Sequence, residues 1–425
     1  MSFALGLVPI VLLLLGFPIF LVLLTAITVA LVFFMNLPLA ALHQNLFGSV
    51  NAYALLAIPY FIYAGELMGR GSVAQRLVDF VQSGTSPLRG SLGITTVGTA
   101  TIFGAISGVS AAAVATIGKV MYPPMVKDGY PKPFAAGLIT AVGAIDIIIP
   151  PSIPMIVYGA AAQESVPRLY AAGMIPGLLI AAILAAYVMW QARRGNFGAS
   201  QPFEFKRFLQ ATVRGLWALG APVIILGGIY GGVFSPTEAA AVACIYAILV
   251  TRFVFRELTW RDILEAAVAT TRFTAQILIV VACAGVFSWL LTVNQVPAAL
   301  VAWLQSLGVG QWSFLLIVNV VLLLIGCFLD PLSAILLLTP LLIPVVKALG
   351  IDTVHFGIVL MVNLAIGLFT PPFGINIFVA QSVLGIDLKT IYRGILPFAA
   401  LYLIGLALIT YVPWLSLAGV WLLLN

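Results

Sequence analysis

The sequence is short of charge. Only 8% of its 425 residues are charged, 63% are apolar, and the mean hydropathy is +1.18. A soluble domain carries about 25% charged residues, so this chain cannot cover itself with a polar surface. That shortage excludes a soluble globular protein and indicates an integral membrane protein.

Cysteine and histidine are also scarce. Cys244, Cys283 and Cys327 stand singly in apolar runs, and His43 and His355 are the only histidines. No Cys-x-x-Cys pair, His-Glu-x-x-His helix, nucleotide-binding glycine loop or Gly-x-Ser-x-Gly turn is present. We therefore expect no enzyme, no cofactor and no nucleic-acid partner. A cleavable signal is not expected either, because the apolar start lacks a basic segment and an Ala-x-Ala site.

Long apolar runs fill the chain, and four of them are interrupted. A span needs roughly 20 apolar residues, so the length allows about ten spans. Two runs turn back without a polar loop, at 107–110 and 330–333, and each predicts a re-entrant hairpin enclosed by protein. Two others contain a double proline, Pro150-Pro151 and Pro371-Pro372, and proline breaks a helix. We expect two hairpins and two discontinuous helices.

These interruptions recur at a nearly constant offset. The double prolines are 221 residues apart, Gly104 and Gly326 are 222 apart, and Ser110 and Ser333 are 223 apart. An ordered series of this kind predicts one unit present twice. Two amphipathic segments, 70–88 and 296–308, also correspond, and the first suggests an arm helix in the membrane interface. The alternative for it is an ordinary connecting loop.

Basic residues indicate the orientation, because Lys and Arg concentrate on the cytoplasmic side. The segment after 169–192 holds the cluster Arg193, Arg194, Lys206, Arg207 and Arg214. With that segment in the cytoplasm, ten spans place both termini outside and leave only Arg168 and Lys347 there. The hairpins then enter from opposite sides, so the repeats are inverted. Inverted repeats with paired broken helices indicate a secondary transporter with its site at the repeat interface.

Candidate ligands lie at the hairpin tips and helix breaks. Ends of half-helices present free N–H groups suited to a carboxylate and free carbonyls suited to a cation. The expected sodium-binding residues are Ser107, Ser110, Gly143, Asp146, Pro150, Asp330, Ser333, Gly367 and Thr370. The expected substrate-binding residues are Ser107, Gly108, Ser152, Pro371 and Asn376. The alternative is that the serines and glycines only allow close helix packing.

Acidic residues inside apolar segments are costly and usually functional. Asp330 either favours a cation or caps the half-helix that follows it. Asp146 has no acidic counterpart, since Gly367 stands at the matching position, and it is either a ligand or a structural hydrogen-bonding group. Glu66 and Glu238 lie near span ends, where a helix terminus or a contact with another subunit explains them.

Neither tip carries a basic residue. Lys119 and Arg272 are the nearest candidates for a buried base. An anionic substrate is therefore expected to be held by helix ends, hydroxyls and bound cations, so that sodium binds first and favours the anion.

Four stretches together resemble the large membrane subunit of TRAP (tripartite ATP-independent periplasmic) transporters. They are Ser107-Gly108-Val109-Ser110, residues 143–159, Ser235-Pro236-Thr237-Glu238-Ala239, and Thr370-Pro371-Pro372-Phe373-Gly374-Ile375-Asn376. The resemblance covers essentially the whole chain. It implies an all-α polytopic fold of the elevator type, like that of the ion transporter superfamily.

The resemblance also implies that the chain is divided into scaffold segments and transport-domain segments. Scaffold helices and the first arm fill 1–90, the first hairpin and broken helix fill 91–163, and further scaffold with the second arm fills 164–309. The second hairpin and broken helix fill 310–385, and a C-terminal helix fills 386–425. The two hairpin units would form the mobile transport domain.

Members import organic acids such as C4-dicarboxylates, keto acids or sialic acid with sodium, across a bacterial inner membrane. The resemblance implies two protein partners, a small four-helix membrane subunit and a periplasmic substrate-binding protein. No extra spans for a small subunit are found at either end, so the unfused kind is expected. One alternative is a stand-alone sodium/dicarboxylate carrier of the same architecture. Another is an intramembrane enzyme or a scaffold subunit that does not transport.

Overall fold

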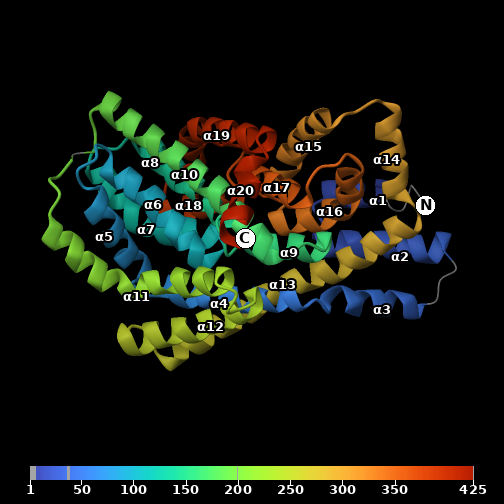
Figure 1. Ribbon diagram of the computed structural model, residues 1–425, viewed down its shortest axis with the longest axis horizontal. Helices are drawn as coiled ribbons and strands as arrows, with labels where there is room; N and C mark the ends of the chain where they lie inside the picture. The colour runs from blue at the N-terminus through green and yellow to red at the C-terminus, as the bar shows by residue number, and fades with distance from the viewer. Residues whose placement is uncertain (1–5, 36–38, 199, 425) are drawn as a thin grey trace.

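The computed structural model describes residues 6–35, 39–198 and 200–424, and these residues form helices and turns without a strand (Figure 1). Residues 1–5 and 36–38 of the first expected unit lie outside this description. Six helices are long and apolar enough to cross a bilayer, and a bent pair makes a seventh. They are α10 (Val166–Gly195), α11 (Phe205–Tyr230), α12 with η4 (Pro236–Val254), α13 (Trp260–Val293), α16 (Pro331–Ala348) and α19 (Leu388–Tyr411), and the pair α3–α4 (Leu42–Val50 with Tyr53–Arg70). The expectation of an all-α polytopic membrane protein is confirmed.

The first unit runs from α2 to α10. Its members are α2 (Ile19–Phe34), α3 (Leu39–Val50), η2 (Tyr53–Leu56), α4 (Ala57–Arg70), α5 (Val73–Thr85), α6 (Ser91–Ser107), α7 (Ser110–Lys127), α8 (Lys132–Val142), η3 (Gly143–Ile147), α9 (Ile153–Ala162) and α10 (Val166–Gly195). Helix α11 (Phe205–Tyr230) follows and leads to the second unit.

The second unit repeats this order. Its members are α12 (Pro236–Leu249), η4 (Val250–Val254), α13 (Trp260–Val293), α14 (Val296–Ser306), α15 (Gln311–Gly326), α16 (Pro331–Ala348), α17 (Thr353–Gly367), α18 (Ile375–Leu384), α19 (Leu388–Tyr411) and α20 (Trp414–Leu424). Helices α9 and α18 each have 10 residues and α7 and α16 each have 18. Helices α5–α7 lie toward the left end of Figure 1 and α14–α16 toward the right end, as inverted repeats would place them.

The two units differ in the helix before the arm. In the first unit it is broken at Asn51–Ala52, and α3 and α4 are bent by 58°. In the second unit α13 is one continuous helix of 34 residues.

The apolar run at the start of the chain does not form a full-length span. The structure gives it helix α1 (Val8–Leu14), which has 7 residues and is therefore only about 10 Å long. Gly16 has a positive φ of 79° and Pro18 precedes α2, so the chain turns before the helix can extend. The ten-span threading thus lacks a full-length first helix.

Both expected breaks lie at the double prolines. Residues 143–152 separate the regular helices α8 and α9, and residues 368–374 separate α17 and α18. Each hairpin crosses the break of its own unit at a glycine. A Cβ on Gly104 would lie 2.9 Å from Asp146 Oδ1, and a Cβ on Gly367 would collide with the Gly326 carbonyl. Helices α6 and α7 of the first hairpin pack along each other, whereas α15 and α16 of the second hairpin diverge. Their re-entrant course in a membrane stays a prediction.

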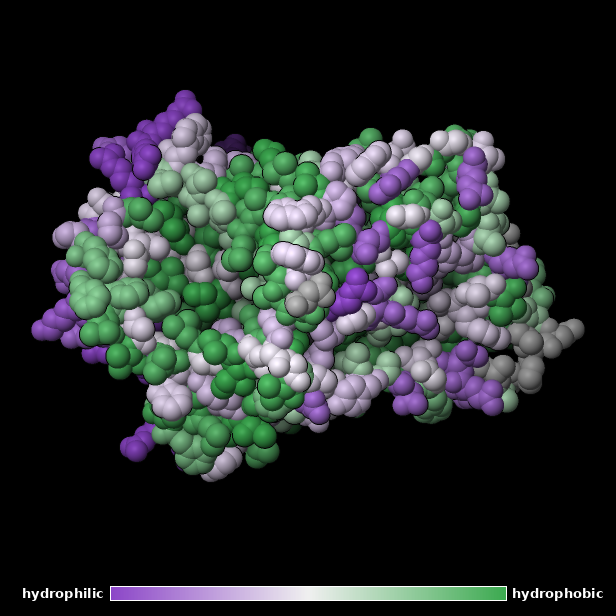
Figure 2. Space-filling view, viewed as in Figure 1, coloured by the Kyte–Doolittle hydropathy of each residue, from purple (hydrophilic) through white to green (hydrophobic). Residues whose placement is uncertain are grey.

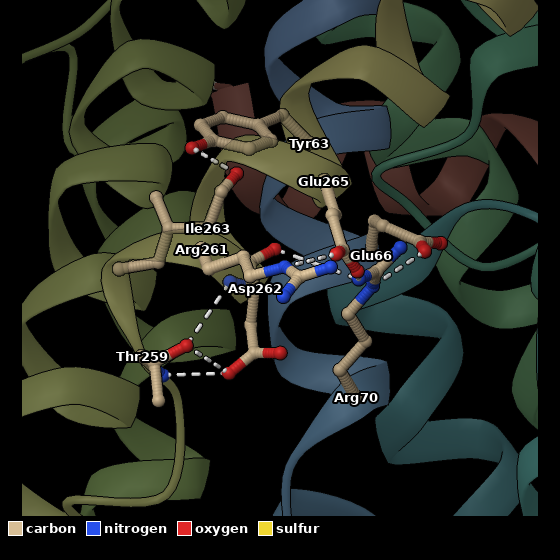
Figure 3. Close-up of polar contacts among 8 residues, drawn as sticks. All are labelled: Tyr63, Glu66, Arg70, Thr259, Arg261, Asp262, Ile263 and Glu265. Carbon is tan, nitrogen blue, oxygen red and sulfur yellow. Dashed lines mark hydrogen bonds and ion pairs between the residues drawn. The ribbon is translucent and has the colours of Figure 1, made fainter.

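Glu66 belongs to a polar cluster that joins the end of α4 to the start of α13 (Figure 3). Arg70 Nε lies 2.9 Å from Glu66 Oε1, and Arg70 Nη1 lies 3.7 Å from Glu265 Oε2. The Tyr63 hydroxyl donates to the Ile263 carbonyl at 3.2 Å. Glu66 therefore pairs within its own helix, and Arg70 and Tyr63 make the contacts that connect the two units.

Glu238 stabilises the N-terminus of helix α12, which is the first of the two explanations offered for it. Its side chain accepts a hydrogen bond from the Ser235 backbone N–H at 2.8 Å, and the Ser235 hydroxyl caps the Glu238 N–H. This is a capping box, which satisfies donors at the start of α12.

The outer surface is largely apolar. Figure 2 shows hydrophobic residues over much of this face, with hydrophilic ones at the left end, near the α5–α6 and α10–α11 connections, and others spread over the right half. A surface of this kind suits a bilayer.

Helices α8 and α19 pack closely where they cross, and this packing can be tested. A Cβ on Gly394 would collide with the Pro133 carbonyl, whereas one on Gly227 of α11 would meet nothing within 4 Å. We expect Gly394→Ala to destabilise the protein by about 1–3 kcal/mol through overpacking, and Gly227→Ala to stabilise its helix by about 0.5–1 kcal/mol. Thermal unfolding of the purified protein in detergent measures both, and equal melting temperatures would contradict the described crossing.

Candidate functional site

The first hairpin tip contacts the first helix break directly. Gly108 ends α6 with φ of 59°, and a Cβ there would lie 2.8 Å from the Pro151 carbonyl oxygen. The left-handed conformation and this close approach together require glycine. The tip therefore lies directly over the unwound backbone of the broken helix.

Ser110 connects three segments. Its hydroxyl donates to the Gly143 carbonyl at 2.7 Å and lies 2.9 Å from Asn376 Nδ2. The Asn376 amide also donates to the Thr140 carbonyl at 3.2 Å. Asn376 belongs to the second unit, so this buried contact joins the start of α18 to the first hairpin.

Asp146 is fully buried in the first break. The Ser107 hydroxyl donates to its Oδ2 at 3.3 Å, and its Oδ1 has no hydrogen-bond partner among the described residues. A buried carboxylate oxygen without a partner is costly. The structure thus brings Ser107 and Asp146 together, and sodium binding by them stays a prediction.

Asp330 is the N-cap of α16. Its carboxylate accepts from the Ser333 backbone N–H at 3.1 Å, which is the capping role weighed for it above. The second carboxylate oxygen makes no hydrogen bond that the structure records. Its other weighed role, favouring a cation, remains compatible with capping.

A cavity of about 390 Å³ lies between both tips and α13. From the expected site it is lined by Gly108, Ser110, Asp330, Ser333 and Asn376. No Lys, Arg or His of the described chain lines it, and most of its wall is apolar. Two tips that are more than 200 residues apart in the sequence therefore share one space.

Other expected site residues lie elsewhere. Ser152 is buried and donates to the Ile147 carbonyl at 2.7 Å, so it holds the first break together. Thr370 donates to the Ile366 carbonyl at 2.6 Å and does not line the cavity. The remaining expected residues outside the cavity wall are Ser107, Gly143, Asp146, Pro150, Gly367 and Pro371.

The far wall of the cavity was missed by the sequence analysis. It consists of Phe273, Gln276, Ile277 and Val280 on α13. Gln276 is a polar residue within a long apolar helix, and that signal could have identified this face.

A buried amide network was also missed. Asn363 Nδ2 donates to Asn319 Oδ1 at 2.7 Å, and Asn319 Nδ2 donates to the Thr410 hydroxyl at 3.0 Å. These polar side chains join α15, α17 and α19 beside the second break.

The chemistry available in the cavity is that of oxygen ligands and helix ends. Hydroxyl, amide and carboxylate oxygens suit a hard cation such as sodium, and the first turns of α7 and α16 offer N–H groups to an anion. No cluster of His, Cys, Asp and Glu suited to a transition metal occurs in the described ranges.

Comparisons with known proteins give a consistent picture. The family model for the DctM component of tripartite ATP-independent periplasmic transporters matches residues 7–415. The C4-dicarboxylate TRAP transporter large permease protein DctM of Pseudomonas aeruginosa is 40% identical and covers 88% of both chains. The ectoine TRAP transporter large permease protein TeaC of Halomonas elongata is 38% identical and covers 96% of both chains.

A solved structure supports the fold alone. The YdaH transporter of Alcanivorax borkumensis superimposes with a TM-score of 0.65 over 98% of both chains, at 16% sequence identity.

The Asn376 contact can be tested by stability. Asn376→Ala removes bonds to Ser110 and to the Thr140 carbonyl in a buried place, and we expect a loss of about 1–3 kcal/mol. Gln305→Ala on α14, which is exposed, serves as the control and should change stability by less than about 0.5 kcal/mol. Thermal unfolding in detergent measures both, and equal effects would refute the cross-unit contact.

Proposed function

Since the chain belongs to the DctM family as a TRAP transporter large permease subunit, we propose that it imports an organic acid in a sodium-coupled elevator cycle. It is a multi-pass membrane protein and not an enzyme. The observation that carries the proposal is the cavity enclosed by both hairpin tips and α13.

Sodium is proposed to bind first, on the oxygen atoms of the tips and breaks. In the first unit Ser110 already meets the Gly143 carbonyl at 2.7 Å, and Ser107 meets Asp146 at 3.3 Å. In the second unit Asp330 and Ser333 face the cavity. A cation in either place would offset carboxylate and carbonyl charge that now lacks a counter-ion.

The organic acid is proposed to follow into the cavity. With no basic side chain in the wall, its carboxylate would be held by helix N-termini, by the Asn376 amide and by bound sodium. Anion binding then depends on the cation, and this dependence is the coupling.

The elevator step is proposed to move both hairpins and broken helices along α13. The wall formed by Phe273, Ile277 and Val280 is apolar, so it offers no fixed hydrogen bonds that would resist sliding. Residues 91–163 and 310–385 would travel, while 1–90, 164–309 and the C-terminal helix would act as scaffold.

Partners and location follow from the family. We propose that a small membrane subunit packs on the scaffold, that a periplasmic binding protein delivers the substrate, and that the complex lies in a bacterial inner membrane. The named substrates of relatives differ, C4-dicarboxylate in one and ectoine in another, so the organic acid is proposed only as a class. A keto acid or sialic acid also belongs to that class.

Uptake into proteoliposomes tests the proposal. With the partner subunits present, an inward sodium gradient is expected to drive uptake of one member of an organic-acid panel. Uptake driven by ATP, or equal uptake without sodium, would refute the mechanism. Uptake that needs no binding protein would instead favour a stand-alone sodium/dicarboxylate carrier.

Two substitutions separate the roles of Asp330. Asn is as good an N-cap as Asp but carries no charge, so Asp330→Asn keeps the cap and removes the counter-charge for sodium. We expect sodium stimulation to be lost in both Asp330→Asn and Asp330→Ala, and thermal stability to fall only in Asp330→Ala. Normal sodium stimulation in Asp330→Asn would show that Asp330 only caps α16.

A further inference from the structure

Lys119 and Arg272 are the basic residues that the sequence analysis considered as buried bases near the hairpin tips. Lys119 lies on α7 and Arg272 on α13, and both side chains are exposed. Neither makes a hydrogen bond or an ion pair with the described residues. They are therefore not buried bases but two cations without a counter-ion, inside helices that are otherwise largely apolar.

Each of the two continues a row of side chains that begins in the wall of the transport cavity. Side chains four residues apart lie one above the other on a helix. Ala111, Ala115 and Lys119 form such a row on α7, and Ala111 lines the cavity. Arg272 lies one turn from Gln276 on α13, and Gln276 lines the cavity from the opposite side.

Both rows run toward the side that the basic residues predict to be cytoplasmic. Helix α7 ends on that side at Lys127, and α13 begins there at Trp260. Along their helices, Lys119 is about 12 Å from Lys127 and Arg272 is about 18 Å from Trp260. Arg272 therefore lies deep within a hydrocarbon layer of about 30 Å. A charge at that depth is costly in lipid and usually lines a water-filled path.

Helix α13 packs against only one of the two hairpins. Helix α16 of the second hairpin packs on it, whereas the described part of α7 makes no comparable contact with it. Helix α4 borders both α7 and α13. A Cβ on Gly69 of α4 would lie 3.9 Å from Thr116 Oγ1 on α7, and Arg70 Nη1 of α4 lies 3.7 Å from Glu265 Oε2 on α13. The rows of Lys119 and Arg272 thus belong to two helices that α4 connects but that do not pack together.

The carboxylates near these rows do not neutralise the two cations. Glu66 on α4 and Glu265 on α13 each lie within 3.1 Å of an arginine of their own helix. Asp330 lines the cavity but forms no ion pair with Lys119 or Arg272. The region on the cytoplasmic side of the cavity therefore keeps a net positive charge.

We propose that Lys119 and Arg272 line a water-filled passage from the cavity to the cytoplasm and form a second, weaker anion site in it. The site takes the carboxylate of the departing organic acid, so this inference rests on the proposed function. Arg272 is about 6 Å from Gln276 along its helix and Lys119 is about 12 Å from Ala111, so the anion meets Arg272 first and Lys119 second. Their attraction favours departure from a cavity that has no basic residue in its wall.

Cysteine labelling measures the charge of the passage without any transported substrate. Ala115→Cys is made in a Cys327→Ser background, because Ala115 is half-buried between Ala111 and Lys119 and the other two cysteines are buried. Inverted membrane vesicles present the cytoplasmic face to sulfonatoethyl methanethiosulfonate, which is negative, or to its trimethylammonium analogue, which is positive. The ratio of the two labelling rates reports the local potential, because the thiol contributes equally to both.

Variants assign the potential to the two cations. One unit charge about 8 Å away in water changes the ratio of negative to positive labelling about fivefold, so R272Q and K119Q are each expected to lower it by about that factor. R272K keeps the charge and should keep the ratio. The matched control R193Q/R194Q removes two exposed arginines at the end of α10 and should change the ratio less than about twofold. A thiol at position 115 that reacts with neither reagent, or a ratio unchanged in both R272Q and K119Q, would overturn the proposal.

Substrate exchange in right-side-out vesicles that contain the partner subunits tests the anion site. R272Q is expected to raise severalfold the internal concentration of organic acid that gives half-maximal efflux, and to leave the external concentration for half-maximal uptake unchanged. An equal rise on both sides, or none on the internal side, would overturn the site. Absence of sodium-driven uptake by the unmodified protein would refute the proposed function instead, and the labelling ratio would still show whether the passage is cationic.

Discussion

Unwound backbone inside an apolar protein has to be satisfied by neighbouring protein groups, and this constraint shapes the whole chain. Each broken helix exposes N–H and carbonyl groups near its double proline. Each hairpin comes this close because glycine stands at the crossing, Gly104 in the first unit and Gly326 opposite Gly367 in the second. The hairpins and breaks therefore form paired units, and the remaining helices are arranged around these pairs.

The two pairs of hairpin and broken helix differ in their polar side chains. The first has Asp146 where the second has Gly367, and the second has the capping residue Asp330 where α7 begins without a side-chain cap. Asn376 then crosses from the second unit to Ser110 of the first. A cation bound in one unit and a ligand held in the other would thus meet through a few buried hydrogen bonds, which makes ordered binding physically reasonable.

Local signals predicted most of the fold. The prolines at 150–151 and 371–372 gave both helix breaks, and the offset between them matched α9 with α18 and α7 with α16. The apolar run at the start of the chain predicted a span, but α1 is too short because Gly16 and Pro18 end the helix early. Contacts between distant segments were beyond local signals. The Asn376–Ser110 bond and the α13 wall depend on how the units pack. Thr370 bonds back to the Ile366 carbonyl at the end of α17, which its sequence position does not reveal.

The helix that precedes the arm helix differs between the two units, and this difference bears on the two end states of the proposed transport cycle. Two identical copies of an inverted unit would allow two conformations that are related by a two-fold rotation and have equal free energy. Here the first copy carries a 58° bend between α3 and α4, whereas the second has the unbroken rod α13. Any two states in which the copies exchange roles must therefore differ in free energy. In the proposed cycle the two end states would therefore not be equivalent, even before an ion or substrate binds.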